Sequence, residues 1–283
     1  MNEQDNGGEV FRILVADDFP PGLSVVMRQL QIPGYRVDGA ENGRQAVEAF
    51  ERTCYDLILM DVDMPEMDGL EASRMIRVIE GGIRGVPCAG PGPGPERVVI
   101  IGLTGDAGED QRVKCTDAGM DDCLEKPVFR KDLLDLVGKW RLSRSADRGA
   151  SSGKEGRREP GRDDAPMRFE TALSEFEGDR QFLIDVLTAF LDACRAQLVK
   201  LEKALRDGDG EVLAGEAHAI RGGAANLTAE SLANVAAELE SLGSSGVLEG
   251  GAEILKRFEK ELLRLESYAA GKGVRTWQER KLA

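Results

Sequence analysis

Short apolar runs alternate with helically spaced segments through the first half of the chain. Two of these runs, LILM and VVIIGL, contain no polar residue, which is typical of strands that are covered on both faces. Strands that alternate with helices form a parallel sheet with helices on both of its faces. The pattern therefore predicts a doubly wound α/β domain, whose five strands we expect at residues 11–17, 35–40, 56–61, 97–104 and 121–126.

The second half of the chain has helical periodicity only. One apolar stripe extends over residues 183–205, and Asp179 is the candidate N-cap of that helix. A second stripe extends over 232–242 after Thr228 as candidate N-cap, and a third extends over 254–265. We expect turns at 206–210 and 242–246. These stripes predict a C-terminal all-α helical bundle.

Apolar periodicity disappears between the two halves, where Gly, Ser, Pro and mixed charges predominate. A flexible segment of this length has an r.m.s. span of roughly 25 to 30 Å, so the flanking domains can meet without being fixed together. A second Gly- and Pro-rich stretch predicts a surface loop at 81–97. The expected organisation is a sheet domain at 10–142, a linker at 143–166, a four-helix bundle at 167–269 and a frayed tail at 270–283.

The net charge of −14 and the lack of a long apolar run argue against two classes of partner. Phosphate backbones are bound by an excess of Lys and Arg, so we expect no nucleic-acid binding. No apolar run approaches the roughly 20 residues of a membrane span, so we expect no membrane insertion. The polar N-terminus does not resemble a secretory signal, and the five cysteines include no CxxC pair. These features favour a cytoplasmic protein with reduced cysteines.

Three carboxylates are expected at the carboxyl ends of two neighbouring strands. Asp17 and Asp18 end the first strand and Asp61 ends the third, and in a flavodoxin-like sheet of order 2-1-3-4-5 these strands flank the ligand-binding edge. Clustered carboxylates repel one another unless a cation neutralises them, and Mg²⁺ prefers oxygen ligands. Thr104 and Lys126 end the fourth and fifth strands and can contact a phosphoryl group at the same edge. The pattern predicts a Mg²⁺-dependent site for phosphoryl transfer with Asp61 as a nucleophile.

Residues 10–142 resemble a response-regulator receiver domain through the motifs ILVADD, LILMDVDMPEMDGLE, IIGLTGDA and GMDDCLEKP. The resemblance implies that Asp61 is the phosphoacceptor, that Thr104 senses the phosphoryl group and that Lys126 pairs with it. It also implies a cis bond between Lys126 and Pro127. The residues that would hold Mg²⁺ are Asp17, Asp18, Asp61 and, through its backbone carbonyl, Asp63.

Two positions depart from the receiver pattern. Receivers commonly have Ala after the switch Thr and an aromatic residue on the fifth strand, where this chain has Gly105 and Cys123. We expect the phosphorylation chemistry to be intact and the allosteric readout to be weak or altered.

The segment GEAHAIRGGAANL, residues 215–227, contains the only histidine of the chain. Its apolar positions predict a helix whose core-facing stripe passes beside His218, so that the imidazole reaches solvent. Gly222 and Gly223 lie inside this helix, although glycine costs about 1 kcal/mol there relative to alanine. Close approach of another surface would explain them. Arg221, at i+3, can pair with a phosphoryl group on the imidazole, whose neutral form is a nucleophile near pH 7.

Residues 167–269 resemble a histidine phosphotransfer (HPt) domain through AHAIRGGAANLTAESL and the preceding FETALSEFEGDRQFLIDVLTAFL. The resemblance implies that His218 is the phosphorylated residue. The family usually has Lys at the position of Arg221 and Gly at the position of Thr228.

Together the two resemblances predict a two-component phosphorelay intermediate. Asp61 would accept a phosphoryl group from phosphohistidine, and His218 would carry phosphoryl groups to or from receiver domains. The expected partners are a sensor histidine kinase and other receiver domains. No ATP-binding motif accompanies His218, so we expect a phosphocarrier with self-catalysed, Mg²⁺-dependent transfer and not an ATP-dependent kinase.

Other functions are less consistent with the sequence. A phosphorylation-dependent binding module, or a phosphate sink without onward transfer, remains an open alternative. A haloacid-dehalogenase-like phosphohydrolase is suggested by DVD at 61–63, but that family has its nucleophile and its acidic pair in the reverse order. No basic recognition helix follows the linker, so a transcription factor has no support. The sequence leaves open whether Asp61 and His218 exchange phosphate within one chain.

Overall fold

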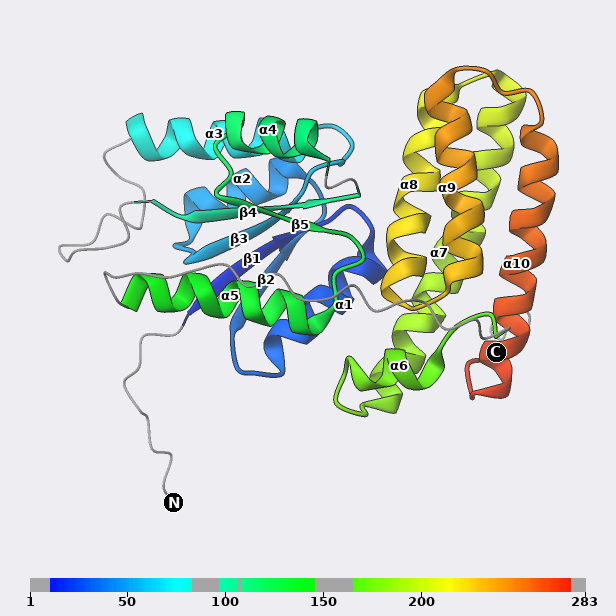
Figure 1. Cartoon of the computed structure of the whole chain (residues 1–283), viewed down its shortest axis with the longest axis horizontal. Helices are drawn as coiled ribbons and strands as arrows, with labels where there is room; N and C mark the ends of the chain where they lie inside the picture. Colours follow the sequence, from blue (N-terminus) through cyan, green and yellow to red (C-terminus); the bar gives the residue numbers. More distant parts are fainter. Residues whose placement is uncertain (1–10, 83–96, 106–107, 146–164, 276–283) are drawn as a thin grey trace.

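The computed structural model describes residues 11–82, 97–105, 108–145 and 165–275. The expected loop at 81–97, the linker and the end of the tail lie largely outside these residues. The described residues form two units, which we call the sheet domain (11–145) and the bundle (165–275) (Figure 1).

Five parallel strands form the sheet in the order β2-β1-β3-β4-β5, which confirms the predicted fold class and strand order. Every residue of β3 and β4 is buried, because helices cover both faces of the sheet. The strands are β1 (Arg12–Ala16), β2 (Arg36–Ala40), β3 (Leu57–Asp61), β4 (Val99–Thr104) and β5 (Asp122–Glu125).

In the described ranges, two helices cover one face of the sheet and three cover the other (Figure 1). The first pair is α1 (Pro20–Gln31) and α5 (Arg130–Ser145). The opposite face carries α2 (Gly43–Arg52), α3 (Gly69–Gly82) and α4 (Glu109–Asp117). The α2 helix begins directly after Asn42, which caps it by accepting a hydrogen bond from the Gln45 amide at 2.8 Å.

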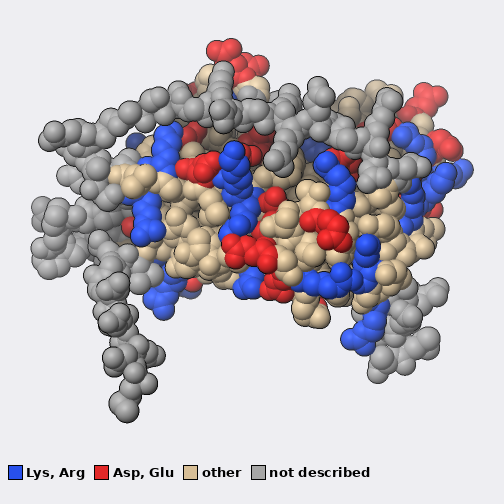
Figure 2. All heavy atoms as spheres, turned by 60° about the horizontal axis from the view of Figure 1, so that its bottom comes forward, with Lys and Arg blue, Asp and Glu red and all other residues tan. Residues whose placement is uncertain are grey.

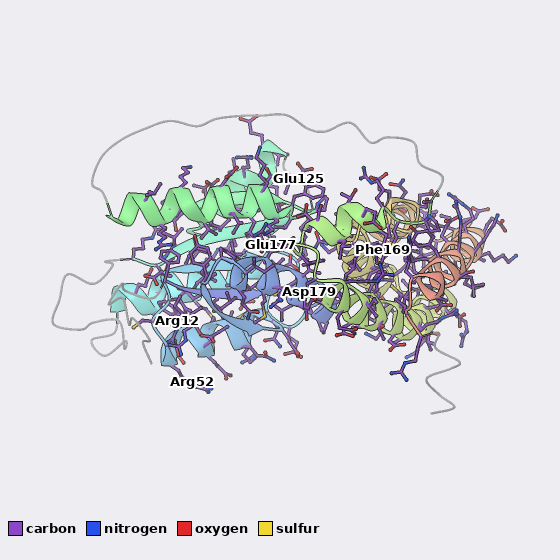
Figure 3. The ribbon with its side chains drawn as sticks, turned by 90° about the horizontal axis from the view of Figure 1, so that it is seen from below. Arg12, Arg52, Glu125, Phe169, Glu177 and Asp179 are labelled. Atoms are coloured by element: carbon purple, nitrogen blue, oxygen red, sulfur yellow. The ribbon has the colours of Figure 1, made fainter. Side chains whose placement is uncertain are left out.

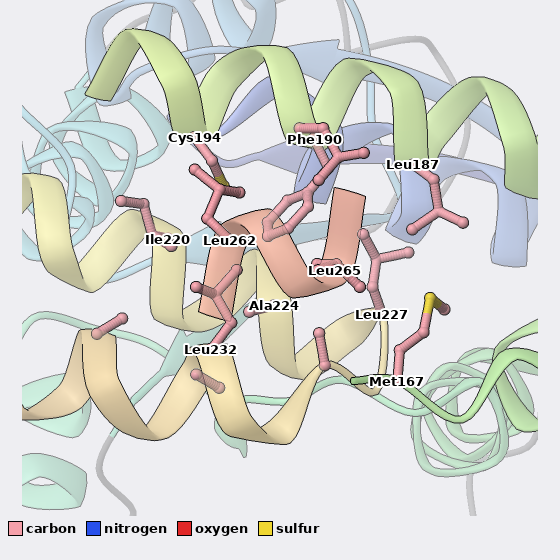
Figure 4. Close-up of a cluster of buried hydrophobic side chains, with 14 of the residues drawn as sticks. Met167, Leu187, Phe190, Cys194, Ile220, Ala224, Leu227, Leu232, Leu262 and Leu265 are labelled. Carbon is pink, nitrogen blue, oxygen red and sulfur yellow. The ribbon is translucent and has the colours of Figure 1, made fainter. Parts of the chain in front are cut away.

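Within residues 165–275, four long helices form the bundle and follow the short α6 (Phe169–Ser174). The four are α7 (Arg180–Asp207), α8 (Gly210–Asn226), α9 (Glu230–Ser245) and α10 (Gly251–Gly271). The predicted N-cap of α7 is confirmed, since the Asp179 side chain accepts a hydrogen bond from the Phe182 amide. The apolar stripes of these helices meet in one core, in which Phe190 and Leu262 are fully buried (Figure 4).

Two local predictions in the bundle are wrong. Ala229, not Thr228, is the N-cap of α9, and the Thr228 hydroxyl instead donates to the Arg168 carbonyl at 3.0 Å. Residues 242–245 of the expected turn lie within α9, and only Gly246, the C-cap of α9, has a left-handed φ, at 69°. Gly243 serves close helix packing, because a Cβ there would lie 2.5 Å from the carbonyl oxygen of Gly210. The turn at 206–210 is confirmed by Gly208, whose φ is 75°.

The bundle is docked against the edge of the sheet domain at which β1 and β3 end (Figure 1). The α1 helix packs on both α7 and α8. Phe19 and Val25 of the sheet domain belong to the same buried cluster as the core of the bundle. The Phe19 ring meets the Phe190 ring edge to face, with centroids 5.8 Å apart. One apolar core therefore continues from the bundle into the sheet domain.

Among the described residues, we find no helix that combines the length and apolar character needed to cross a membrane. Figure 2 shows Lys and Arg side chains among Asp and Glu side chains on one face of the molecule.

Candidate functional site

The three predicted carboxylates lie together at the carboxyl edge of the sheet. Asp17 and Asp18 directly follow β1, and Asp61 is the last residue of β3, which pairs with β1. One oxygen from each of Asp17, Asp18 and Asp61 lies within 4.8 Å of the others. Three carboxylates at this spacing match the oxygen ligands that Mg²⁺ prefers, so the residues present fit that ion.

Lys126 is the cation that contacts this cluster. Its Nζ donates to Asp61 Oδ2 at 2.6 Å and to Asp17 Oδ2 at 3.2 Å. Burial raises the pKa of Asp61 to about 7, since Lys126 opposes this shift only in part and Asp17 adds to it. Burial raises the pKa of Asp18 to about 6, and the charge of Asp17 contributes. The cluster therefore holds more negative charge than one ammonium group compensates.

Two further predicted residues border the cluster. Thr104 is buried at the end of β4, and its carbonyl accepts a hydrogen bond from the Lys126 amide at 2.8 Å. The Asp63 amide donates to Asp61 Oδ1 at 3.4 Å, and the Asp63 side chain is exposed. The bond between Lys126 and Pro127 is cis, as the resemblance implied.

His218 projects from α8 toward this edge of the sheet. The predicted stripe beside it is confirmed, because Leu213, Ala217, Ile220, Ala224 and Leu227 are all buried. The expectation that the imidazole reaches solvent is wrong, since the side chain is only 14% exposed. The docked sheet domain covers it, and His218 Nε2 lies 3.8 Å from Asp63 Oδ2.

Glu240 of α9 fixes the orientation of this imidazole. His218 Nδ1 lies 2.8 Å from Glu240 Oε1, and a carboxylate can only accept this hydrogen bond, so Nδ1 carries the proton. Burial lowers the pKa of His218, but the hydrogen bond and charge of Glu240, with the charge of Asp63, raise it above its usual value. The Glu240 contact therefore turns Nε2, with its lone pair, away from α9.

Arg221 connects the histidine helix with the sheet domain. Its Nε lies 3.0 Å from Glu240 Oε2, and its Nη2 donates to the Gly105 carbonyl at 3.4 Å. A Cβ at Gly105 would lie 2.0 Å from Arg221 Nη2 and 3.0 Å from His218 Cε1. The departure of Gly105 from the receiver pattern thus makes room for the guanidinium and imidazole groups of α8.

The paired glycines of α8 have different surroundings. A Cβ at Gly223 would lie 2.2 Å from Phe19 Cε1, whereas a Cβ at Gly222 would make only an ordinary contact with Lys126, at 3.8 Å. The expected close approach of another surface is confirmed for Gly223, and that surface belongs to the same chain.

Both domains line one small pocket. Its walls include Asp17, Asp18, Asp61 and Lys126 from the sheet domain and His218 and Asn226 from the bundle. His218 Nε2 is buried and has no hydrogen-bond partner among the described residues. A buried polar atom without a partner is costly, so this nitrogen marks a position for a group that the pocket would bind.

Sequence reasoning missed Glu240 and Asn226. Glu240 lies among several acidic residues on α9, and its spacing gives no signal that it faces His218. Asn226 Oδ1 accepts a hydrogen bond from the Val128 amide at 2.9 Å, across the domain boundary. Such a contact becomes visible only once the domains are placed relative to one another.

Comparison with known families agrees with this geometry. Residues 13–138 match the model of the response regulator receiver domain, and residues 185–268 match the model of the Hpt domain. The chain therefore contains a receiver domain followed by an Hpt domain. This combination supports a role in a two-component phosphorelay.

Known relatives include sensor proteins of bacteria. The virulence sensor protein BvgS of Bordetella pertussis is 30% identical over 236 residues, which are 81% of this chain and 18% of BvgS. The sensor protein EvgS of Escherichia coli is 30% identical over 232 residues, which are 82% of this chain and 17% of EvgS. The chain thus spans about a fifth of the length of these curated relatives.

A similar solved structure is the receiver domain of the sensor histidine kinase PA1611 from Pseudomonas aeruginosa PAO1, which has a magnesium ion coordinated in its active site cleft. It is 36% identical to the matched part of this chain, and the match covers 47% of this chain and 98% of that one, with a TM-score of 0.39.

Proposed function

We propose that this chain transfers a phosphoryl group between Asp61 and His218 within one molecule, and that His218 exchanges it with the receiver domain of another protein. A sensor histidine kinase would supply the group to Asp61. The observation that carries this proposal concerns His218 Nε2, which is buried, has no hydrogen-bond partner in the described part of the chain and borders the same pocket as Asp61.

The transfer step follows from the hydrogen bonds of the imidazole. The lone pair of neutral Nε2 attacks the phosphorus of the Asp61 acyl phosphate, an N–P bond forms, and the bond between phosphorus and the aspartyl oxygen breaks. The electron pair of the broken bond leaves on the Asp61 carboxylate. Positive charge develops on the imidazole, whose Nδ1–H remains bonded to the Glu240 carboxylate at 2.8 Å. Glu240 thereby stabilises the product electrostatically.

Cationic side chains would hold the phosphoryl oxygens during the step. Lys126 already contacts Asp61, and Arg221 extends from α8 to the Gly105 carbonyl. Asp17 and Asp18, with Asp61 and the backbone carbonyl of Asp63, would hold Mg²⁺, which neutralises phosphoryl oxygens when it is bound. Thr104 ends β4 at the same edge and would donate its hydroxyl to a phosphoryl oxygen.

Onward transfer requires the two domains to separate. In the docked arrangement the His218 side chain is 14% exposed, and the sheet domain occupies the surface that a second receiver would need. The proposal therefore includes alternation between a docked state, in which Asp61 and His218 exchange the group, and an open state, in which His218 meets other receivers. A chain that remained docked would act as a phosphate sink.

Single-turnover labelling tests this proposal. The full chain is incubated with Mg²⁺ and acetyl phosphate, which can phosphorylate Asp61, and the label is located by mass spectrometry. We expect label on His218 in the wild type, label on Asp61 only in His218→Gln, and no label on either residue in Asp61→Ala. Labelling of His218 in Asp61→Ala at the wild-type rate would contradict the proposal. A second receiver that removes the label from His218 would exclude the phosphate sink.

A further inference from the structure

A second contact between the domains lies outside the phosphoryl-transfer pocket. It involves the acidic segment, which we define as Glu175, Glu177 and Asp179, between α6 and the start of α7. Figure 3 shows Glu177 and Asp179 at the boundary between the sheet domain and the bundle. The segment precedes residues 185–268, the range that matches the Hpt model.

Asp179 binds both its own helix and the sheet domain. One carboxylate oxygen accepts the hydrogen bond from Phe182 that caps α7, and the other accepts a hydrogen bond from Arg28 of α1 at 2.7 Å. The Arg28 guanidinium also lies over the Phe182 ring, 5.4 Å from its centroid. Arg28 is thus held by a charge and by an aromatic face, both of which belong to the bundle.

Glu175 and Glu177 bind the first residue of α5. The Arg130 amide donates to Glu175 Oε2 at 2.7 Å, and this amide is one of the N–H groups that a helix leaves without an intrahelical partner. The negative charge of Glu175 also suits the N-terminus of a helix dipole. The Arg130 side chain donates to Glu177 Oε1 at 2.5 Å. The bundle therefore caps a helix of the sheet domain across the interface.

We propose that the acidic segment selects the receiver domain that docks on His218, favouring receivers with a cation at each of the positions held by Arg28 and Arg130. This inference rests on the proposed function and adds the partner preference of the same site. The preferred partner in this chain is its own sheet domain. The segment takes no part in the chemical step of phosphoryl transfer. It changes only the fraction of molecules in which a receiver domain is docked on His218.

Charge complementarity carries the selection. A receiver with an acidic residue at position 28 or 130 would place two negative charges against each other at the edge of the interface, and such repulsion excludes wrong partners. The side chains of Arg28 and Asp179 are 37% and 35% exposed, and that of Glu177 is 58% exposed, so solvent screens each pair. We therefore expect a change of about two- to fivefold in rate from each exposed pair.

Exchange of the charges at positions 130 and 177 in the full chain tests whether this ion pair affects docking. Arg130→Glu and Glu177→Arg should each slow labelling of His218 by about two- to fivefold, and the double variant should recover the wild-type rate. Asp179→Asn keeps a side chain that can cap α7 and removes only the charge opposite Arg28, so it should slow labelling without unfolding the bundle. Glu238→Gln is the matched control, since Glu238 pairs with Arg257 inside the bundle.

Transfer between two full chains measures selection directly. The acceptor chain carries both Asp61→Ala and Glu177→Arg. Two donor chains carry His218→Gln and are phosphorylated on Asp61. One donor keeps Arg130, and the other also carries Arg130→Glu. We expect the Arg130→Glu donor to label His218 of the acceptor several times faster than the unmodified donor. Equal rates for the two donors would overturn the proposal. Lack of His218 labelling in the wild-type chain would instead overturn the proposed function.

Discussion

Phe19 of the sheet domain lies against Gly223 of α8, at a position where a Cβ on residue 223 would come within 2.2 Å of its ring. The same ring packs edge to face on Phe190 of α7 and is 4% exposed. The contact explains why a helix tolerates glycine at 223, and it brings the residue that follows Asp18 into the core of the bundle. The approach of the two reacting groups therefore depends on an apolar contact next to them.

Gly223→Ala should weaken docking while it leaves the chemistry intact. The added Cβ overlaps the Phe19 ring, and overpacking of this kind costs about 1 to 3 kcal/mol. We expect labelling of His218 to slow by about five- to hundredfold in single-turnover experiments. Gly222→Ala is the matched control, because its Cβ meets only Lys126 Cδ at 3.8 Å. Equal slowing by both substitutions would show that helix geometry, and not the Phe19 contact, is responsible.

Gly105→Ala should slow the same step through a different contact. Its Cβ would lie 2.0 Å from Arg221 Nη2. Because Nη2 is at the end of a flexible side chain that can move aside, we expect docking to weaken by only about 1 kcal/mol, which slows labelling of His218 roughly fivefold. Arg221→Lys in the same chain has a smaller head group and should restore part of the rate. A Gly105→Ala variant that transfers at the wild-type rate would contradict the steric explanation.

Glu240→Gln should lower the pKa of His218. In the wild type this pKa lies above the usual 6.5, so the contact between the imidazolium and Glu240 stabilises the folded protein below pH 6.5 and this contribution is lost as the pH rises through the folded pKa. Gln can still accept the Nδ1–H bond but has no charge. NMR titration measures the shift directly because His218 is the only histidine.

The same variant makes a kinetic prediction. Only the neutral imidazole attacks phosphorus, so labelling of His218 should rise with pH through the pKa of His218, and this rise should move to lower pH in Glu240→Gln. Glu238→Gln on the same helix should leave both the titration and the pH profile unchanged. A pKa of His218 that does not respond to Glu240→Gln would contradict the assigned contact.

Mg²⁺ should stabilise the chain through the acidic cluster. A ligand that binds only the folded state raises the melting temperature, and three neighbouring carboxylates with one compensating lysine provide the site. We expect Mg²⁺ to raise the melting temperature of the wild type and not that of Asp18→Asn. Removal of Mg²⁺ with EDTA should abolish labelling of Asp61 by acetyl phosphate. Asp117→Asn, on the exposed side of α4, should behave as the wild type.

The order of the sheet and the position of the acidic cluster could be predicted because they follow from local pattern. The apolar runs that became β3 and β4 are buried along their whole length, and parallel strands bring their carboxyl ends to one edge. The predicted cluster therefore forms at this edge, with Asp17, Asp18, Asp61 and Lys126 in contact or close to one another.

The exposure of His218 could not be predicted, because it depends on how the two domains meet. Helical periodicity placed the imidazole correctly beside the core stripe, but no local pattern indicates that Phe19 docks on α8. Glu240 was missed for a related reason, since it is 22 residues away from His218 and resembles the other acids of α9. Residue type alone makes Thr228 a candidate cap, whereas its hydroxyl donates a hydrogen bond to the Arg168 carbonyl.

We propose that Asp61 and His218 of one molecule exchange a phosphoryl group in the docked state. The most direct test is the rate constant for labelling of His218, measured in single-turnover experiments over a hundredfold range of protein concentration. Transfer within one chain predicts a first-order rate constant that does not change with concentration, and His218→Gln chains added in excess should not compete. A rate that rises in proportion to protein concentration would show that the two residues react only between different molecules, and would contradict the claim.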